Sequence, residues 1–203
     1  MKSLYVTDRR AIGDATFERL LDSLYGAAGI TVELREKGTP DRETLRWAES
    51  AHQRLGSEVP LFVNRRLDVA LAAKADGVHL PADGLPLSRV RSASPRGLRV
   101  GVSTHSVEEA VRAIGEGADL VVIGPVFETP SKVSFGAPLG PGVLEDLPPL
   151  SAHDAEIFAI GGIAERRLEE IARFRSSLSG IAAIRLFQEA ADPRAVVEMI
   201  GRL

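Results

Sequence analysis

The chain has 203 residues, of which 44% are hydrophobic, a net charge of −3 and no cysteine, which suits one domain over residues 1–203 with a single sizeable core. The lack of cysteine excludes disulfides, thiolate metal ligands and a cysteine nucleophile. No run approaches the roughly 18 apolar residues of a membrane span, and the start "MKSLYVTDRR" lacks the apolar core of a signal peptide, so we expect a cytoplasmic protein without a membrane partner. No tract rich in lysine and arginine occurs, so we expect no nucleic-acid partner.

Short aliphatic or β-branched runs recur along the chain with helical patterns between them, as in repeated strand–helix–strand units. In chain order the predicted strands are "SLYVT" (3–7), "ITVEL" (30–34), "PLFVN" (60–64), "DGVHL" (76–80), "LRVGV" (98–102), "DLVVIG" (119–124), "EIFAIG" (156–161) and "GIAAI" (180–184). They are mostly apolar on both faces, which is typical of parallel strands covered by helices.

Between the strands the apolar period changes to that of a helix. Apolar residues recur at i, i+3, i+4 and i+7 over 17–24, 107–114 and 196–203, and Asp192 with Pro193 suits the start of the last helix. Eight strands with eight helical crossovers predict an α/β fold, a single (β/α)8 TIM barrel. An open doubly wound sheet is the alternative.

In a barrel of this kind the chemistry lies at the carboxyl ends of the strands. Arg35 and Lys37 follow the second strand two residues apart, so both point to one side and Glu36 to the other. Two cations at the mouth suit an anionic substrate, although charge at a strand end is often only solvated. Asn64, at the end of the third strand, is a further candidate for binding substrate.

Glycines stand at two later turns, in "AIGGI" (159–163) and "SGIAAI" (179–184). Barrels often bind a phosphate through backbone N–H groups at the last two strands, and glycine lets the backbone approach an anion closely. We therefore predict a phosphate site at Gly161, Gly162 and Gly180. The alternative is that these glycines only relieve crowding in the barrel.

Two histidines lie near the predicted mouth. His105 follows Ser103 after the fifth strand and precedes Ser106, which forms a capping box with Glu109 for the next helix. A histidine there suits proton transfer to a bound ligand, and a plain surface histidine is the alternative. His79 falls within the fourth strand, which favours a hydrogen-bonded lining residue over a catalytic one.

The longest irregular stretch, 124–142, follows the sixth strand and carries Lys132. A loop lysine is ordinarily exposed, and a contact with the substrate phosphate is the functional interpretation.

Eight motifs, in register with the eight strands, carry a family resemblance. They are "LYVTD", "ELREK", "LFVNRRLDVA", "GVHLPADGLP", "GVSTHSVEEA", "GPVFETPSK", "AIGGI" and "GIAAI". In this order they resemble the superfamily of thiamine phosphate synthase and the TenI-like thiazole tautomerases. The resemblance covers nearly the entire chain and implies a small phosphorylated thiazole as substrate.

The two branches differ in their use of magnesium. The resemblance implies that a synthase holds Mg²⁺ through an aspartate after the strand-three asparagine and another in a Gly-Gln-x-Asp pattern after strand four. This chain has Arg65 at the first position and Gly84 at the second, with Asp83 one residue early. We therefore predict a tautomerase without a metal or other cofactor.

The predicted reaction aromatises a dihydrothiazole phosphate carboxylate by moving a proton, with His105 as the acid and base. The resemblance implies backbone phosphate binding by Gly161, Gly162, Gly180, Ile181 and Ala182, and substrate contacts by Arg35, Lys37, Asn64, Ser103 and Lys132. A Mg²⁺-dependent synthase, coupling a pyrimidine pyrophosphate to a thiazole phosphate, and a non-catalytic thiazole phosphate-binding regulator are the alternatives. The outward faces of the helices could pair between two copies of the chain, so a homodimer is possible.

Overall fold

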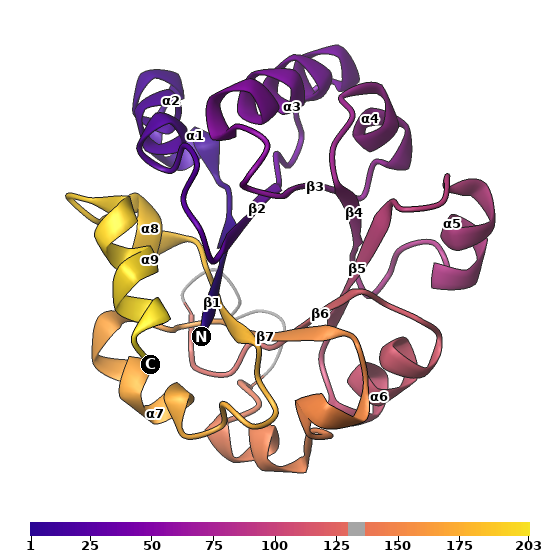
Figure 1. The fold of residues 1–203 in the computed structure, drawn as a ribbon, viewed down its shortest axis with the longest axis vertical. Coiled ribbons are helices and arrows are strands. Elements are labelled where there is room, and N and C mark those ends of the chain that lie inside the picture. The colour runs from indigo at the N-terminus through magenta and orange to yellow at the C-terminus, as the bar shows by residue number, and fades with distance from the viewer. Residues whose placement is uncertain (130–136) are drawn as a thin grey trace.

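A closed ring of eight parallel strands surrounded by helices forms the protein in the computed structural model, which describes residues 1–129 and 137–203 (Figure 1). The strands are β1 (Lys2–Val6), β2 (Ile30–Leu34), β3 (Leu61–Asn64), β4 (Gly77–Leu80), β5 (Arg99–Thr104), β6 (Leu120–Ile123), β7 (Glu156–Ile160) and β8 (Gly180–Ala183). The helices are α1 (Arg9–Ile12), α2 (Asp14–Ser23), α3 (Asp41–Leu55), α4 (Leu67–Ala72), α5 (Leu87–Ala93), α6 (Val107–Gly115), α7 (Leu168–Ala172), α8 (Arg185–Gln188) and α9 (Pro193–Gly201).

Each strand pairs in parallel with the next, and β8 returns to pair with β1. Lys2 lies opposite Gly180 and Tyr5 lies opposite Ala183, so the hydrogen-bonded ladder closes. The predicted (β/α)8 TIM barrel is confirmed, and the open sheet is wrong because it would leave two unpaired edge strands. Closure brings the carboxyl ends of all eight strands to one mouth.

Two apolar layers stabilise the barrel, because successive strand residues point to opposite faces. The outer layer packs strand residues such as Val32 and Val63 against helix residues such as Phe17 and Leu21, all fully buried. The inner layer fills the barrel itself and consists of Leu4, Val6, Phe62, Leu120, Val122, Phe158 and Ala182.

One crossover differs from the prediction of eight helical connections. Between β6 and β7, the described residues form only 3₁₀ segments, Pro141–Asp146 and Leu150–Ala152. Pro148 and Pro149 stand between these segments, and a proline inside an α-helix removes a hydrogen bond and clashes with the preceding turn. No helix in residues 1–129 and 137–203 has both the length and the apolar composition needed to cross a membrane.

Candidate active site

Four polar side chains line the barrel interior near the carboxyl ends of β2 to β5. Asn64 Nδ2 donates to Glu33 Oε1 at 2.8 Å, and His79 Nε2 lies 2.8 Å from Ser103 Oγ. Glu33 Oε2 is 3.5 Å from His79 Nδ1, which brings the two pairs together, although this buried nitrogen has no hydrogen-bond partner in the described residues. Glu33 is 3% exposed and His79 is 1% exposed. Because buried polar groups need partners, this network holds one half of the mouth in a fixed polar arrangement.

The surroundings of His79 disfavour its charged form. Burial lowers its pKa below the usual value, the nearby charge of Arg35 lowers it further, and the carboxylate of Glu33 opposes both effects. The interpretation of His79 as a hydrogen-bonded lining residue is therefore confirmed.

The segment after β2 places its charges on alternate sides, as its spacing predicts. The Glu36 side chain is 1% exposed and accepts a hydrogen bond from Thr7 Oγ1 at 2.7 Å. Lys37 is exposed, and its pKa is lowered mainly by the charge of Arg35, then by burial and by the charge of Arg65. Because β2 and β3 are paired neighbours in the barrel, the cations that follow them lie on one side of the mouth.

The two positions implied to hold Mg²⁺ do not fit that ion. Arg65 places a guanidinium where a carboxylate ligand is needed, and it forms an ion pair with Asp83. Gly84 has no side chain to offer, and Asp83, the residue before it, would be a single exposed carboxylate beside the guanidinium of Arg65. Magnesium prefers hard oxygen ligands, so this donor set disfavours it. Within residues 1–129 and 137–203, no group of three or more histidine, aspartate or glutamate side chains is placed to share a metal ion.

His105 lies at the rim, one residue beyond β5, and its side chain is exposed. Its Nδ1 is 2.6 Å from the carbonyl oxygen of Gly124, which only accepts, so Nδ1 donates this hydrogen bond. The predicted cap of α6 is present: Glu109 N donates to Ser106 Oγ at 3.2 Å. The Glu109 carboxylate in turn accepts from the His105 N–H at 2.7 Å, which fixes the residue at the mouth.

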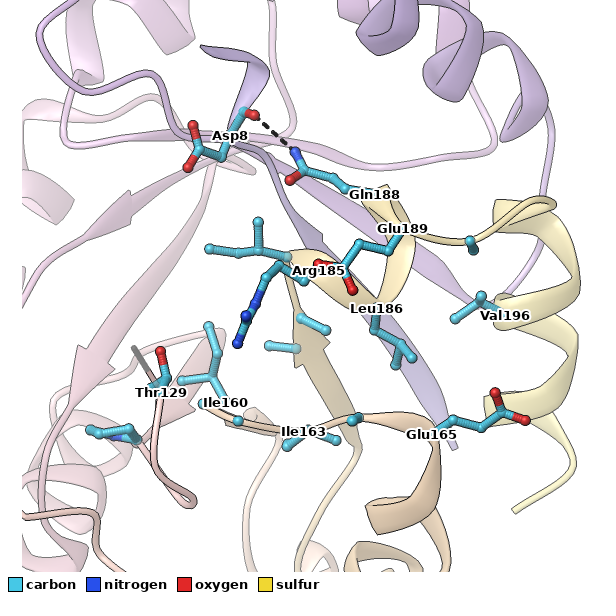
Figure 2. A pocket seen from close by; sticks show the side chains of 18 of the residues that line it. Asp8, Thr129, Ile160, Ile163, Glu165, Arg185, Leu186, Gln188, Glu189 and Val196 are labelled. Carbon is cyan, nitrogen blue, oxygen red and sulfur yellow. Dashed lines mark hydrogen bonds between the residues drawn. The ribbon is translucent and has the colours of Figure 1, made fainter. Parts of the chain in front are cut away.

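A cavity of about 810 Å³ opens beside the ends of β7 and β8, and Gly161 and Gly162 form part of its wall (Figure 2). Both glycines have left-handed φ angles, 104° and 65°. A Cβ on Gly161 would lie 2.5 Å from Pro125 Cβ, and one on Gly162 would lie 2.5 Å from the Glu128 carbonyl oxygen. Only glycine therefore allows this turn to pack beneath the segment that follows β6.

The structure places the other predicted phosphate residues differently. Gly180 is the first residue of β8, opposite Lys2, so it lies at the amino end of the barrel and away from the mouth. Ile181 is buried in the outer apolar layer, and only Ala182 reaches the cavity. The predicted strand already began at Gly180, so assigning this glycine to the mouth overlooked that only the carboxyl end of the strand reaches it. Lys132 lies outside the described residues.

Sequence reasoning missed two charged residues. Arg185 begins α8, and its side chain extends into the cavity toward Ile160 and Thr129 (Figure 2). The sequence feature that could have identified Arg185 is its position two residues beyond the end of the last strand. Glu33 was hidden inside the apolar run "ITVEL", where a single acid among strand residues was the available signal.

The predicted residues therefore form two groups. Arg35, Lys37, Asn64 and Ser103 belong to strand ends β2, β3 and β5, whereas Gly161 and Gly162 belong to the cavity beside β7 and β8. In the ring β3 and β7 are four strands apart, so the two groups face each other across the mouth (Figure 1).

A TIM barrel with a polar mouth and a glycine turn after β7 defines a class of small-molecule enzymes and binding proteins. The family model described as thiamine monophosphate synthase matches residues 4–187, and the chain belongs to this family. The thiamine-phosphate synthase of Chlorobium phaeovibrioides is 39% identical over 199 residues, covering 97% of this chain and 91% of that protein. The thiamine-phosphate synthase of Roseiflexus castenholzii is 34% identical over 196 residues, covering 96% and 84%.

A solved structure of thiamine phosphate pyrophosphorylase from Pyrococcus furiosus superposes with a TM-score of 0.79 at 28% identity, covering 99% of this chain and 94% of that chain. These relatives overturn the prediction of a tautomerase, and with it the prediction of an isomerase, because the similar proteins are named as synthases, which are transferases. The two missing aspartates were too narrow a basis for assigning the reaction.

Proposed function

We propose that this protein is a thiamine-phosphate synthase, a transferase that couples a pyrimidine pyrophosphate to a thiazole phosphate. The observation that carries the proposal is the presence of two regions suited to anions, one with cationic side chains and one with a glycine turn, on opposite sides of one mouth. Arg35 and Lys37 lie at the end of β2, and Gly161 and Gly162 lie beside β7 with Arg185 nearby. A reaction that joins two phosphorylated molecules needs one such region for each of them.

In this reaction the thiazole nitrogen forms a bond to the pyrimidine methylene carbon, and the bond from that carbon to the pyrophosphate oxygen breaks. The bonding electrons leave with the pyrophosphate, so negative charge grows on the leaving group. Cations already positioned there stabilise the transition state more than the ground state. Arg35 and Lys37 supply this charge in our proposal.

The remaining residues position the two substrates. Asn64 and Ser103 hold polar atoms of the pyrimidine side, because each is itself oriented by a buried partner, Glu33 or His79. The backbone of Gly161 and Gly162, and the wall at Ala182, form the thiazole phosphate side. His105 contacts the bound pair from the rim, and contacts by Lys132 and pairing of two copies of the chain stay predictions.

The test is the formation of thiamine phosphate and pyrophosphate from the two substrates, followed by chromatography in parallel reactions with Mg²⁺ and with a chelator. We expect product with the wild type and a loss of about ten-fold or more in kcat/KM for Lys37→Gln, because a charged hydrogen bond contributes about 1.5–3 kcal/mol. Lys74→Gln is the matched control, since Lys74 is exposed beside the amino end of β4, away from the mouth.

No product under either condition would reject the transferase. If the wild type then still bound the thiazole phosphate, the protein would be a non-catalytic binder of that ligand. If Lys37→Gln and Lys74→Gln reacted equally well, the role given to the cations after β2 would be wrong.

A further inference from the structure

Arg65 occupies an unusual backbone position at the mouth. Its φ angle is 65°, in the left-handed region that non-glycine residues rarely adopt, and its N–H donates to the His79 carbonyl oxygen at 2.8 Å. This hydrogen bond ties the residue after β3 to β4. The side chain is half exposed, at 53%, so the guanidinium is held at the rim and stays accessible to a ligand.

Arg65 belongs to a cluster of three cations, Arg35, Lys37 and Arg65, which we call the mouth cations. β2 and β3 are paired neighbours with Leu34 opposite Val63, so the segments that carry these cations leave the barrel side by side, and the charges of both arginines lower the pKa of Lys37. The carboxylates of Asp8 and Asp83 oppose this effect. Among these five groups positive charge therefore exceeds negative charge by one.

A guanidinium can do part of the work of a divalent cation toward a phosphate. It is permanently charged, and its planar fork of N–H donors matches two phosphate oxygens at once. It supplies one positive charge where Mg²⁺ supplies two, and the neighbouring Arg35 and Lys37 add the remainder. Gly84, which has no side chain, leaves no competing carboxylate at the second position.

The present partner of Arg65 is suited to exchange. Asp83 is 78% exposed, and an ion pair in that setting is weak because water and salt screen it. A multiply charged anion that reaches the rim can displace this carboxylate from the guanidinium. Until then the guanidinium of Arg65 is paired with Asp83.

We propose that Arg65, together with Arg35 and Lys37, binds the pyrophosphate group of the substrate in place of a divalent metal ion. The inference rests on the proposed function for the identity of the substrate, but the anion site itself does not depend on catalysis. It makes this chain a metal-independent variant at a position where the family resemblance implies magnesium.

The test is isothermal titration of the full-length protein with inorganic pyrophosphate in the presence of a chelator. We expect binding by the wild type without a divalent ion, and about ten-fold weaker binding by Arg65→Gln, which loses charge-assisted hydrogen bonds but keeps a non-glycine residue at the same φ angle. Arg66→Gln is the matched control, because the neighbouring guanidinium is already paired with Asp41 and Asp68. Thermal unfolding of each variant shows whether it is folded.

A double variant, Arg65→Asp with Gly84→Asp, restores carboxylates at the two positions where the family resemblance implies magnesium ligands. Its two added carboxylates should make pyrophosphate binding depend on Mg²⁺, whereas the wild type should bind equally well without it. If the wild type binds pyrophosphate only with Mg²⁺, or if Arg65→Gln and Arg66→Gln bind equally well, the inference is overturned.

The two proposals fail in different ways. If the wild type forms thiamine phosphate only when Mg²⁺ is present, the transferase stands and the role of Arg65 is rejected. If pyrophosphate binds without metal through Arg65 but no product forms under any condition, the anion site stands and the transferase is rejected.

Discussion

The substitution Gly180→Ala separates barrel closure from phosphate binding. A Cβ on Gly180 would lie 2.1 Å from the Lys2 carbonyl oxygen and 2.7 Å from Phe158 Cε1, far inside van der Waals contact. Neither neighbour can move easily, because Gly180 is paired with Lys2 of β1 on one side and with Phe158 of β7 on the other. Overpacking of this kind costs about 1–3 kcal/mol, and the backbone contact places Gly180→Ala at the upper end. For a chain of about 200 residues, 3 kcal/mol lowers the melting temperature by about 6–12 °C.

The assay combines calorimetric unfolding with titration of inorganic phosphate well below the melting temperature. Gly180→Ala should unfold earlier and bind phosphate like the wild type, because the residue lies at the amino end of the barrel. Gly115→Ala is the control: nothing lies within 4 Å of a Cβ there, and alanine should stabilise α6 by up to about 1 kcal/mol. An unchanged melting temperature, or a loss of phosphate affinity in folded Gly180→Ala, would refute this reasoning.

Two further predictions concern stability. Burial lowers the pKa of His79 in the folded state, so as the pH falls this histidine takes up a proton in the unfolded chain before it does so in the folded protein. The free energy of unfolding should therefore decrease below about pH 6.5, the ordinary pKa of histidine, and be constant just above it. Urea unfolding between pH 5 and 8 should show this slope reduced in His79→Gln and retained in His52→Gln. Ser106→Ala should lower the free energy of unfolding by about 1 kcal/mol by removing the cap of α6, whereas a change below about 0.3 kcal/mol would show that the cap is not needed.

The periodic part of the fold was predictable from the sequence. Strand and helix periods located all eight strands, and "PLFVN" at 60–64 differs from β3 at Leu61–Asn64 by one residue. In the described part of the crossover from β6 to β7, the expected helix is replaced by 3₁₀ segments, because the prediction followed the alternation of strand and helix and neglected the prolines there. A repeated pattern predicts its regular members well and says little about an exception.

The site was predictable only in part, because contacts between residues of different strands cannot be seen in the residue order. Arg35 and Lys37 were found from their two-residue spacing after a strand. Gly180 was assigned to the mouth although it is the first residue of the predicted strand, whose other end reaches the mouth. Glu33 escaped notice because burial beside Asn64 makes a lone acid tolerable inside an apolar run, and that neighbour comes from a different strand.

The interior of the barrel is divided in a way that bears on how two substrates meet. On the side of β2 to β5 the upper interior is polar, with Glu33 and His79 as its buried members, whereas Val6 and Val122 with Ile160 and Ile184 make the side of β1 and β6 to β8 apolar. In the proposed synthase, a polar heterocycle bearing the pyrophosphate gains hydrogen bonds on the first side, and a thiazole ring gains apolar contact on the second. Under that proposal, two unlike rings placed on two unlike walls would meet near the barrel axis, and the new bond would form there.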